Sequence, residues 1–234
     1  MPNPYFRFKQ FTIHQDRCVM KVCTDSCILG AWTALRLGNV KNILDIGTGT
    51  GLLPLMLSQK TESPVDSIEW DPASVAQARE NIQVSPWAET IRVLEGDARD
   101  FSFDSPYDFI ITNPPFFASD LRSPQERKNK AKHDQSLTLD QLMVVINNNL
   151  NPNGNFSILL PYHRTSFFEE LAKGFGFLLR EKLVVRQTPS HPPFRSIGLF
   201  GFSGSREVST TEMVIRDNNG KYTPAFTELM KDYY

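Results

Sequence analysis

The stretch "KNILDIGTGTGLLPLMLSQK", residues 41–60, already indicates how this chain is built. Residues 41–46 carry two β-branched isoleucines and predict a short buried strand. A turn with three glycines follows, and after it an apolar run with helical character. A strand that leads into a helix through such a turn is typical of α/β sheets that bind ligands at the carboxyl ends of their strands.

The alternation of strands and helices continues along the rest of the chain. Further strands are predicted at 65–70, 90–97, 107–113, 154–161, 177–187 and 196–204, and helices at 24–37, 72–84, 138–150 and 165–176. This order predicts an α/β fold with a doubly wound, mostly parallel, seven-stranded sheet and an antiparallel hairpin at one edge. We expect residues 1–234 to form a single domain, with 1–40 as a short N-terminal extension that packs on the ligand site.

Length and composition limit the class of protein. A chain of 234 residues can bury a core without disulfide bridges. Its three cysteines, Cys18, Cys23 and Cys27, are an odd number, and no pair has the two-residue spacing of structural zinc sites, so a metal site with His14 is not expected. The sequence offers no membrane-spanning stretch and no signal-peptide core, which predicts a soluble, cytoplasmic protein with no membrane partner. A monomer is expected.

The net charge is −1, but acidic and basic residues are separated along the chain. Residues 45–110 hold 12 acidic and 4 basic side chains, whereas residues 111–133 hold 5 basic and 2 acidic ones. Such blocks are often no more than solvated helix faces. They gain a functional meaning where they meet beside a site, because one block then attracts a cation and the other an anion.

The glycine turn "LDIGTGTG", residues 44–51, is the first candidate binding site. A structural turn needs one glycine, whereas Gly47, Gly49 and Gly51 together let a ligand lie against the main chain. Their spacing departs from the dinucleotide fingerprint, and Asp45 places a negative charge where a pyrophosphate would lie. A cationic ligand suits this carboxylate better. S-adenosylmethionine carries a sulfonium and an ammonium group, and it is the cofactor that we expect.

Acidic residues end the next two predicted strands. Glu69 lies where a carboxylate can accept both hydrogen bonds of a ribose diol, and Trp70 beside it can pack on an adenine. Asp97 can accept a hydrogen bond from the amino group of that adenine. Asp71 precedes a proline and is interpreted as the N-cap of the next helix. One carboxylate alone is more often a surface residue, but carboxylates at three successive strand ends favour a cofactor site.

The stretch "YDFIITNPPFF", residues 107–117, ends a buried strand with Asn113, Pro114, Pro115 and Phe116. Neither proline can continue the ladder of hydrogen bonds, so the chain leaves the sheet extended and rigid. We assign catalysis to these four residues. The side-chain oxygen of Asn113 and the carbonyl of Pro114 can hold the two hydrogens of an exocyclic amine and turn its lone pair toward a methyl donor. Phe116 offers a flat face on which an extruded base can stack.

These motifs, in this order, resemble those of Rossmann-like class I S-adenosylmethionine-dependent methyltransferases with an N-P-P-[FY] motif, which methylate planar nitrogens. With "MKVCTDSCILGAW" at 20–32 and "YTPAFTELMKDYY" at 222–234, the chain is similar to the bacterial tRNA adenine-N6-methyltransferases, which modify adenosine 37, next to the anticodon of a valine tRNA. One departure is Asp232-Tyr233-Tyr234, where that family usually has D-F-Y. The resemblance implies this activity, a tRNA partner and a cofactor site formed by Lys21, Asp45, Gly47, Thr48, Gly49, Gly51, Glu69, Trp70, Asp97, Ala98 and Asn113.

Basic residues follow the two prolines directly. The segment "RSPQERKNKAKH", residues 122–133, is placed to contact phosphates beside the site. The predicted RNA-binding residues are Arg122, Arg127, Lys128, Lys130, Lys132 and Arg195. Arg164, Lys182 and Arg186 are expected to extend the same positive rim, and "PSHPPFR", residues 189–195, to form a rigid wall. No DNA partner is expected.

Two other functions stay open at this point. Enzymes with this motif also methylate guanine N2 in ribosomal RNA or the glutamine amide of a protein, but such relatives usually carry an additional N-terminal domain, which residues 1–40 are too short to form. A nucleotide-binding oxidoreductase, or a binding module without catalysis, is the other alternative. Binding of S-adenosylmethionine compared with NAD separates it from a methyltransferase.

Overall fold

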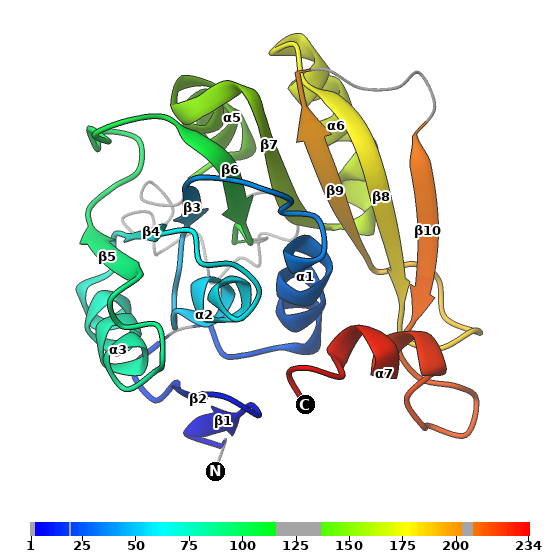
Figure 1. Ribbon diagram of the computed structural model, residues 1–234. Coiled ribbons are helices and arrows are strands. Elements are labelled where there is room, and N and C mark those ends of the chain that lie inside the picture. The colour runs from blue at the N-terminus through cyan, green and yellow to red at the C-terminus, as the bar shows by residue number, and fades with distance from the viewer. Residues whose placement is uncertain (1–2, 19, 116–136, 203–207) are drawn as a thin grey trace, which may run out of the picture.

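The computed structural model of the protein describes residues 3–18, 20–115, 137–202 and 208–234 (Figure 1). The strands are β1 (Tyr5–Arg7), β2 (Thr12–His14), β3 (Ile43–Ile46), β4 (Val65–Glu69), β5 (Ile91–Glu95), β6 (Tyr107–Thr112), β7 (Leu150–Pro161), β8 (Leu178–Arg186), β9 (Arg195–Gly201) and β10 (Ser209–Val214). The helices are α1 (Thr24–Ala34), α2 (Leu52–Ser58), α3 (Pro72–Gln83), α5 (Leu139–Asn149), α6 (Thr165–Gly174) and α7 (Pro224–Met230), with a 3-10 turn η3 (Tyr162–Arg164). None of the helices in the described ranges is long and apolar enough to cross a membrane.

The main sheet confirms the predicted α/β fold and differs from the prediction by one strand. Within the described residues its order is β10-β8-β9-β7-β6-β3-β4-β5, and β1 pairs with β2 in a small separate sheet. The strands of the main sheet run parallel except β9, which pairs antiparallel with β7 and β8 and forms the predicted hairpin. The eighth strand, β10, pairs parallel with β8 outside that hairpin. Its first four residues are polar and exposed. Its sequence therefore does not show the apolar alternation from which strands are predicted.

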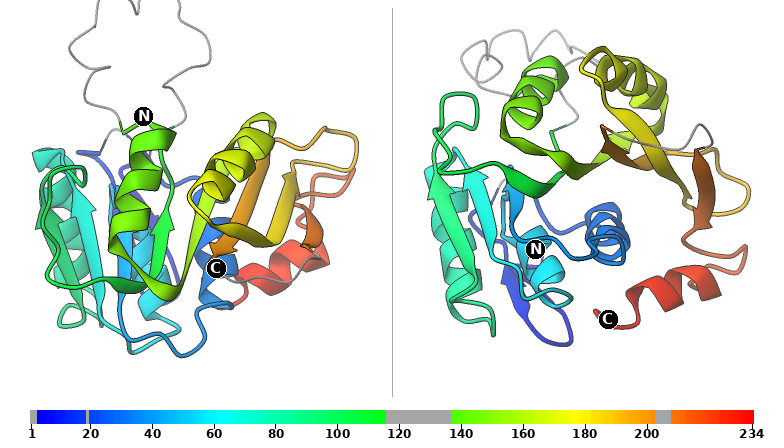
Figure 2. Two further views of the ribbon diagram at one scale, coloured as in Figure 1. Left: turned by 90° about the horizontal axis from the view of Figure 1, so that it is seen from above. Right: turned by 45° about the horizontal axis from the view of Figure 1, so that its top comes forward.

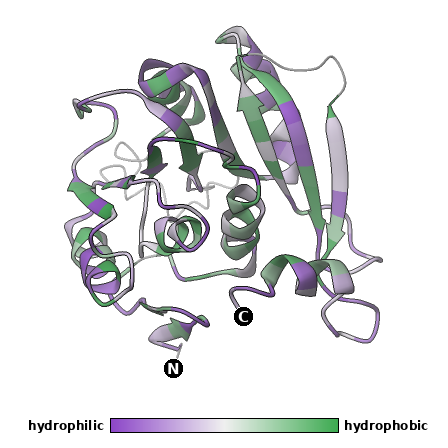
Figure 3. Ribbon diagram, in the orientation of Figure 1, coloured by the Kyte–Doolittle hydropathy of each residue, from purple (hydrophilic) through white to green (hydrophobic). Residues whose placement is uncertain are grey.

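Helices cover both faces of this sheet (Figure 2). The core on one face includes residues of α1, α2 and α7, and the core on the other includes residues of α5 and α6. Strand β6 serves both, because Phe109 and Ile111 point into the first core and Ile110 into the second, and all three are 0% exposed. Burial on both faces explains the continuous apolar run of this strand, whose apolar residues are green in Figure 3.

The two ends of the chain meet on the face that carries α1, α2 and α7 (Figure 1). The backbone N–H of Lys9 donates to the carbonyl of Tyr233 at 2.9 Å. Tyr233 stands where the resembling family usually has phenylalanine. It is 2% exposed, and its hydroxyl donates to the carbonyl of Met56 in α2 at 3.1 Å. This bond satisfies the additional buried hydroxyl, so the aromatic exchange fits the core.

The segment between β2 and α1 lies along α3. Asn81 of α3 accepts a hydrogen bond from the N–H of His14 at 2.9 Å and donates to the carbonyls of His14 and Thr50 at 2.8 and 2.9 Å. Gln77 of α3 accepts from the N–H of Arg17 at 3.3 Å. The side chains of Asn81 and Gln77 are both buried. Because Thr50 belongs to the glycine turn, these bonds hold the N-terminal segment beside that turn.

Candidate active site

The register of the sheet brings the predicted site residues to one edge. Ile46, the last residue of β3, lies opposite both Ile68 of β4 and Thr112 of β6. The glycine turn, Glu69 and Asn113 follow these residues directly, so they lie at neighbouring carboxyl ends, roughly 5 Å apart from strand to strand. Open parallel sheets bind their ligands at this edge.

The glycine turn presents an open surface there. Gly47, Gly49 and Gly51 have φ of 78°, 55° and 81°, in the left-handed region that favours glycine. A Cβ atom on Gly47 or Gly49 would meet no described atom within 4 Å, whereas on Gly51 it would lie 3.5 Å from Ala78 of α3. The first two glycines therefore leave space for a ligand, whereas at Gly51 a Cβ would make only an ordinary contact with α3, and its positive φ is what favours glycine.

Glu69 ties the glycine turn to the start of α3. Its side chain is buried and accepts hydrogen bonds from the N–H of Gly49 at 2.9 Å and from those of Trp70 and Asp71 at 3.0 Å. Asp71 accepts from the N–H of Ser74 at 2.9 Å, which confirms it as the N-cap of α3. Trp70 is half-exposed. The sequence predicts a ribose contact for Glu69, and the structure adds that this carboxylate shapes the turn.

Asp45 is a buried carboxylate without a hydrogen-bond partner among the described residues. It is 0% exposed, and neither of its oxygens has a partner. Burial raises the pKa of Asp45 from 3.8 to about 7; the nearby Thr48 hydroxyl acts in the opposite direction, and the charge of Glu69 raises the pKa further. A positive charge offsets the cost of ionising such a group. Asp45 therefore fits a cation at the glycine turn.

Asp97 follows β5 at the same edge and is held by a residue that the sequence analysis missed. The Nε atom of Arg99 donates to the two oxygens of Asp97 at 2.9 and 3.0 Å, and the backbone N–H of Arg99 donates to one of them at 2.9 Å. These bonds lower the pKa of Asp97 and keep it ionised at neutral pH. Ala98, between the two residues, packs against the core. The signal available in the sequence was a basic residue two positions after a strand-end carboxylate.

Asn113 lies directly after β6 and presents an unpartnered oxygen. Its Oδ1 is buried and has no hydrogen-bond partner among the described residues, whereas its Nδ2 donates to the sulfur of Met20 at 3.8 Å. Pro114 is buried and Pro115 is exposed. The contact with Met20 joins two segments far apart in the sequence, so no local pattern indicates it. The amide thus keeps an acceptor available at the ligand edge.

Several predicted residues lie outside the described part of the chain. They are Phe116, Arg122, Arg127, Lys128, Lys130 and Lys132. Their roles in stacking and in RNA binding stay predictions.

Comparison with known proteins identifies the family. The model of the methyltransferase small domain family matches residues 32–166. The chain belongs to this family. A tRNA1(Val) (adenine(37)-N6)-methyltransferase of Dyadobacter fermentans is 41% identical over 99% of this chain and 98% of its own length, and one of Bacteroides fragilis is 36% identical over 100% and 99%. The resemblance found in the sequence is thereby confirmed. A solved structure, a predicted O-methyltransferase of Agrobacterium tumefaciens, matches with a TM-score of 0.62 at 16% identity over 89% of this chain and 96% of its own, which confirms the class I methyltransferase fold.

In this methyltransferase the remaining predicted residues are exposed or make contacts within the protein. Lys21 is exposed. Arg195 is partly buried, and its Nε lies 2.7 Å from the carboxylate of Asp25. The other expected rim residues are engaged within the protein: Lys182 with Glu169 at 3.0 Å, Arg186 with Glu212 at 2.9 Å, and Arg164 over the ring of Phe167 at 5.0 Å. The structure therefore commits these side chains to internal contacts, and their RNA role stays a prediction.

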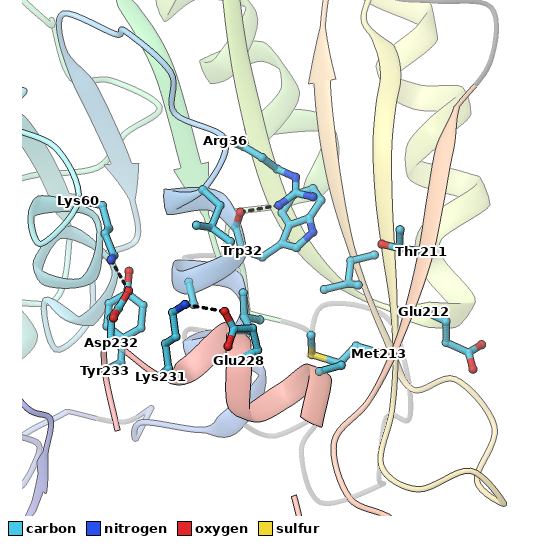
Figure 4. A pocket seen from close by; sticks show the side chains of 15 residues that line it. Trp32, Arg36, Lys60, Thr211, Glu212, Met213, Glu228, Lys231, Asp232 and Tyr233 are labelled. Carbon is cyan, nitrogen blue, oxygen red and sulfur yellow. Dashed lines mark hydrogen bonds and ion pairs between the residues drawn. The ribbon is translucent and has the colours of Figure 1, made fainter. Parts of the chain in front are cut away.

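A cavity of about 350 Å³ lies elsewhere in the methyltransferase (Figure 4). The second half of α1, helix α7 and strands β8 and β10 surround it. Its charged residues are in ion pairs: Lys60 with Asp232, Lys231 with Glu228, Arg36 with Glu181, and Glu212 with Arg186. None of the predicted cofactor or catalytic residues lines it. The candidate active site is therefore the carboxyl edge of the sheet and not this cavity.

Proposed function

We propose that this methyltransferase transfers the methyl group of S-adenosylmethionine to N6 of an adenosine in tRNA, at position 37 next to the anticodon of valine tRNA. The observation that carries the proposal is the buried Oδ1 of Asn113, one strand away from the carboxylate of Asp45, where neither group has a hydrogen-bond partner in the described part of the chain. The names of the full-length relatives favour the same substrate. A tRNA substrate implies a cytoplasmic enzyme.

The glycine turn and the strand before it fit S-adenosylmethionine. The partnerless carboxylate of Asp45 suits the positive charges of this cofactor, and the hydroxyl of Thr48, also without a partner among the described residues, adds a donor. The open faces of Gly47 and Gly49 give a ligand room against the main chain. When bound, the cofactor supplies a methyl carbon made electrophilic by a positively charged sulfur.

The ends of β4 and β5 are assigned to the adenosine part of the cofactor. Glu69, oriented by backbone N–H groups, is proposed to accept from the ribose hydroxyls, and the half-exposed Trp70 to pack on the adenine. Asp97 is proposed to accept from the adenine amine, beside Ala98, with Arg99 holding the carboxylate in its ionised form. We also propose that residues 1–40, Lys21 among them, close this site from the side of α3.

Asn113 and Pro114 orient the acceptor amine. The exocyclic nitrogen of adenine is a poor nucleophile because its lone pair is delocalised into the ring. The Oδ1 of Asn113 and the carbonyl of Pro114 are proposed to accept the two amine hydrogens and so turn the lone pair toward the methyl donor. Orientation of this kind can supply roughly 7–11 kcal/mol of the barrier. No strong base is needed, since the proton leaves after the nitrogen has become cationic.

The RNA is proposed to be held through its phosphates and through one unpaired base. The basic residues predicted between Arg122 and Lys132 contact phosphates, and Phe116 stacks on the target base. An adenosine in an anticodon loop is already unpaired, so little free energy is lost when it leaves the stack. We also propose that the enzyme acts as a monomer.

Substitution of Asn113 by alanine tests the proposal. With tritiated S-adenosylmethionine and unmodified tRNA, the wild-type protein should label N6 of adenosine 37, which mapping of the labelled nucleotide detects. Loss of an oriented acceptor should lower the turnover of Asn113→Ala by roughly 100-fold, by analogy with the removal of one oxyanion-hole donor. Its affinity for the cofactor, measured by calorimetry, should stay unchanged. Asn219→Ala, on an exposed turn, is the matched control. Equal turnover of the Asn113 variant and the wild type would remove the acceptor role.

The same assay separates the alternatives. Label on guanine N2 of ribosomal RNA, or on a protein glutamine, would replace tRNA as the substrate while keeping the chemistry. Binding of NAD without binding of S-adenosylmethionine would leave an oxidoreductase or a binding module instead.

A further inference from the structure

An ion pair joins two distant segments at the carboxyl edge of the sheet. The Nε atom of Arg195 donates to Oδ2 of Asp25 at 2.7 Å, and the two residues are 170 positions apart. The side chain of Asp25 is 9% exposed and that of Arg195 is 26% exposed. Asp25 lies in the first turn of α1, and Arg195 is the first residue of β9. The pair therefore fixes the start of this helix to the start of this strand.

The sheet register places this pair on the acceptor side of the proposed active site. β9 runs antiparallel to β7, so Arg195 lies opposite Pro161, the last residue of β7. Strand β6, which leads to Asn113, pairs with the other side of β7. Two strand spacings, roughly 10 Å, therefore separate β9 from β6. Residues 189–195, which were predicted to form a rigid wall, therefore reach this edge of the sheet two strands away from Asn113.

Both partners make further contacts that fix main chain near the site. A terminal nitrogen of Arg195 donates to the carbonyl of Phe194 at 3.1 Å, and the N–H of Tyr162 donates to the same carbonyl at 3.1 Å. The other oxygen of Asp25 accepts from the N–H of Ser26 at 3.1 Å. Arg195 thereby holds the end of the segment 189–195 in place, and Asp25 holds the first turn of α1.

The start of α1 is also linked to the catalytic amide. Met20, five residues before Asp25, receives the Nδ2–H of Asn113 on its sulfur at 3.8 Å. A shift of the first turn of α1 would move this sulfur and free the amide of Asn113 to turn. A buried ion pair contributes little net stability, because desolvation offsets its Coulomb energy, but loss of one partner leaves a buried charge. Removal of either partner should therefore lower stability as well as release the two segments, and only the kinetic readouts separate these effects.

On the basis of the proposed function, we propose that Asp25 and Arg195 are positioning residues of the acceptor site. The pair holds residues 20–25, which lead into α1 and contact Asn113 through Met20, against residues 189–195. Arg195 acts through Asp25 and not as a phosphate contact. This assignment replaces the RNA-binding role predicted for Arg195 from the sequence.

Four variants test this assignment: Asp25→Asn, Arg195→Met, the double variant of these two, and Glu212→Gln as the control. Glu212→Gln breaks another arginine–carboxylate pair, between Arg186 of β8 and Glu212 of the edge strand β10. We expect Asp25→Asn and Arg195→Met each to lower kcat on unmodified tRNA by roughly 10-fold or more. KM for tRNA and the affinity for the cofactor should change less than about twofold, and the double variant should be no worse than the poorer single variant.

The salt dependence of tRNA binding decides between positioning and a phosphate contact. If Arg195 positions the site, the slope of log K against log salt stays the same in Arg195→Met. A slope smaller by about one, with Asp25→Asn unaffected, would make Arg195 a phosphate contact and overturn the inference. A fall in kcat accompanied by an equal rise in KM, an equal loss of cofactor affinity and a lower melting temperature would show that the pair only supports the fold. This result would overturn the inference as well.

A second readout keeps this test separate from the proposed function. Amide hydrogen exchange of the protein without substrate should increase in Asp25→Asn both at residues 20–26 and at residues 189–194. Such coupled loosening supports the lock even if the wild-type protein fails to methylate tRNA, a failure that would count against the proposed function alone. Loosening confined to residues 20–26 would overturn the lock.

Discussion

Replacing Asp45 by asparagine should stabilise the protein without its cofactor and weaken cofactor binding. Asp45 is 0% exposed, and neither of its oxygens has a hydrogen-bond partner among the described residues. Asparagine has nearly the same shape and carries no charge. It therefore removes the cost of a buried charge and, with it, the attraction for a cation.

The size of the effect follows from the pKa. Burial raises the pKa of Asp45 from 3.8 to about 7. Between these values the folded state binds a proton that the unfolded state has released, so the stability present below the unfolded pKa is lost as the pH rises to the folded pKa. At about 1.4 kcal/mol per pH unit, the loss reaches roughly 4 kcal/mol by pH 8, of which about 3 kcal/mol falls between pH 5 and pH 8.

Urea unfolding of the wild type and Asp45→Asn, without cofactor, measures this loss. The free energy of unfolding of the variant relative to the wild type should rise by about 3 kcal/mol between pH 5 and pH 8. Asp97→Asn is the contrasting control. Because Arg99 lowers the pKa of Asp97, that carboxylate contributes stability above the unfolded pKa, and its variant should be the less stable protein at neutral pH. If the difference in free energy of unfolding between Asp45→Asn and the wild type is constant over this pH range, the reasoning is refuted.

Cofactor binding gives the complementary measurement. Calorimetry should show the affinity of the wild type for S-adenosylmethionine falling as the pH drops below about 7, because a proton then competes with the cation for Asp45. Asp45→Asn should bind more weakly at pH 8 and lose this component of the pH dependence. An Asp45→Asn protein that binds as tightly as the wild type at pH 8 would exclude Asp45 from the cofactor site.

Three further substitutions test the parts of the site separately. Glu69→Gln replaces the charged acceptor of the Gly49 N–H, so its affinity for S-adenosylmethionine by calorimetry should fall by roughly 10-fold. Gly49→Ala should lose about 1–2 kcal/mol in urea unfolding because its φ of 55° is strained for alanine, and its Cβ should also weaken cofactor binding. Thr223→Ala removes the N-cap that accepts from the Phe226 N–H; a lower melting temperature, from a loss of about 1 kcal/mol, should accompany unchanged methyl transfer.

The sequence predicted the structure best at glycines and prolines, because each of these residue types allows or imposes only a few backbone conformations. Three alternate glycines before a helix, and an asparagine followed by two prolines after a strand, each predict a backbone shape that the surrounding chain cannot easily change. The structure confirms that the turn has positive φ at Gly47, Gly49 and Gly51, and that it lies at the level of Asn113. The family follows from the same motifs.

The contacts that sequence reasoning missed depend on tertiary structure. Arg99 was local enough to be found, but Met20 and Asp25 reach the site from a segment whose place is set by side chains of α3. Arg195 shows why such contacts cannot be found from the sequence. A charged side chain at a strand end fits both an RNA contact and an internal ion pair, and only the position of α1 shows that Asp25 is its partner. The exposed strand β10 was missed because its sequence has no apolar face.

Unpartnered buried groups do not by themselves mark a site in this protein. Ser58, the last residue of α2, also has a buried oxygen without a partner among the described residues. Asp45, Thr48 and Asn113 differ from it because the register of β3 and β6 gathers them at one carboxyl edge, where Ser67 of β4 also lies opposite Asp45.

The two carboxylates that flank this edge respond to charge in opposite ways. Asp97 is kept ionised by Arg99 whatever is bound, whereas Asp45 at neutral pH is balanced between its two forms. Only a ligand that brings a positive charge to the glycine turn shifts Asp45 fully to its anion and recovers the free energy of burial. A pyrophosphate in the same place would instead favour the protonated carboxyl and lose that gain. We therefore propose that the site selects its cofactor by the sign of the cofactor's charge, and that the acidic stretch of residues 45–110 extends the same preference beyond the contact itself.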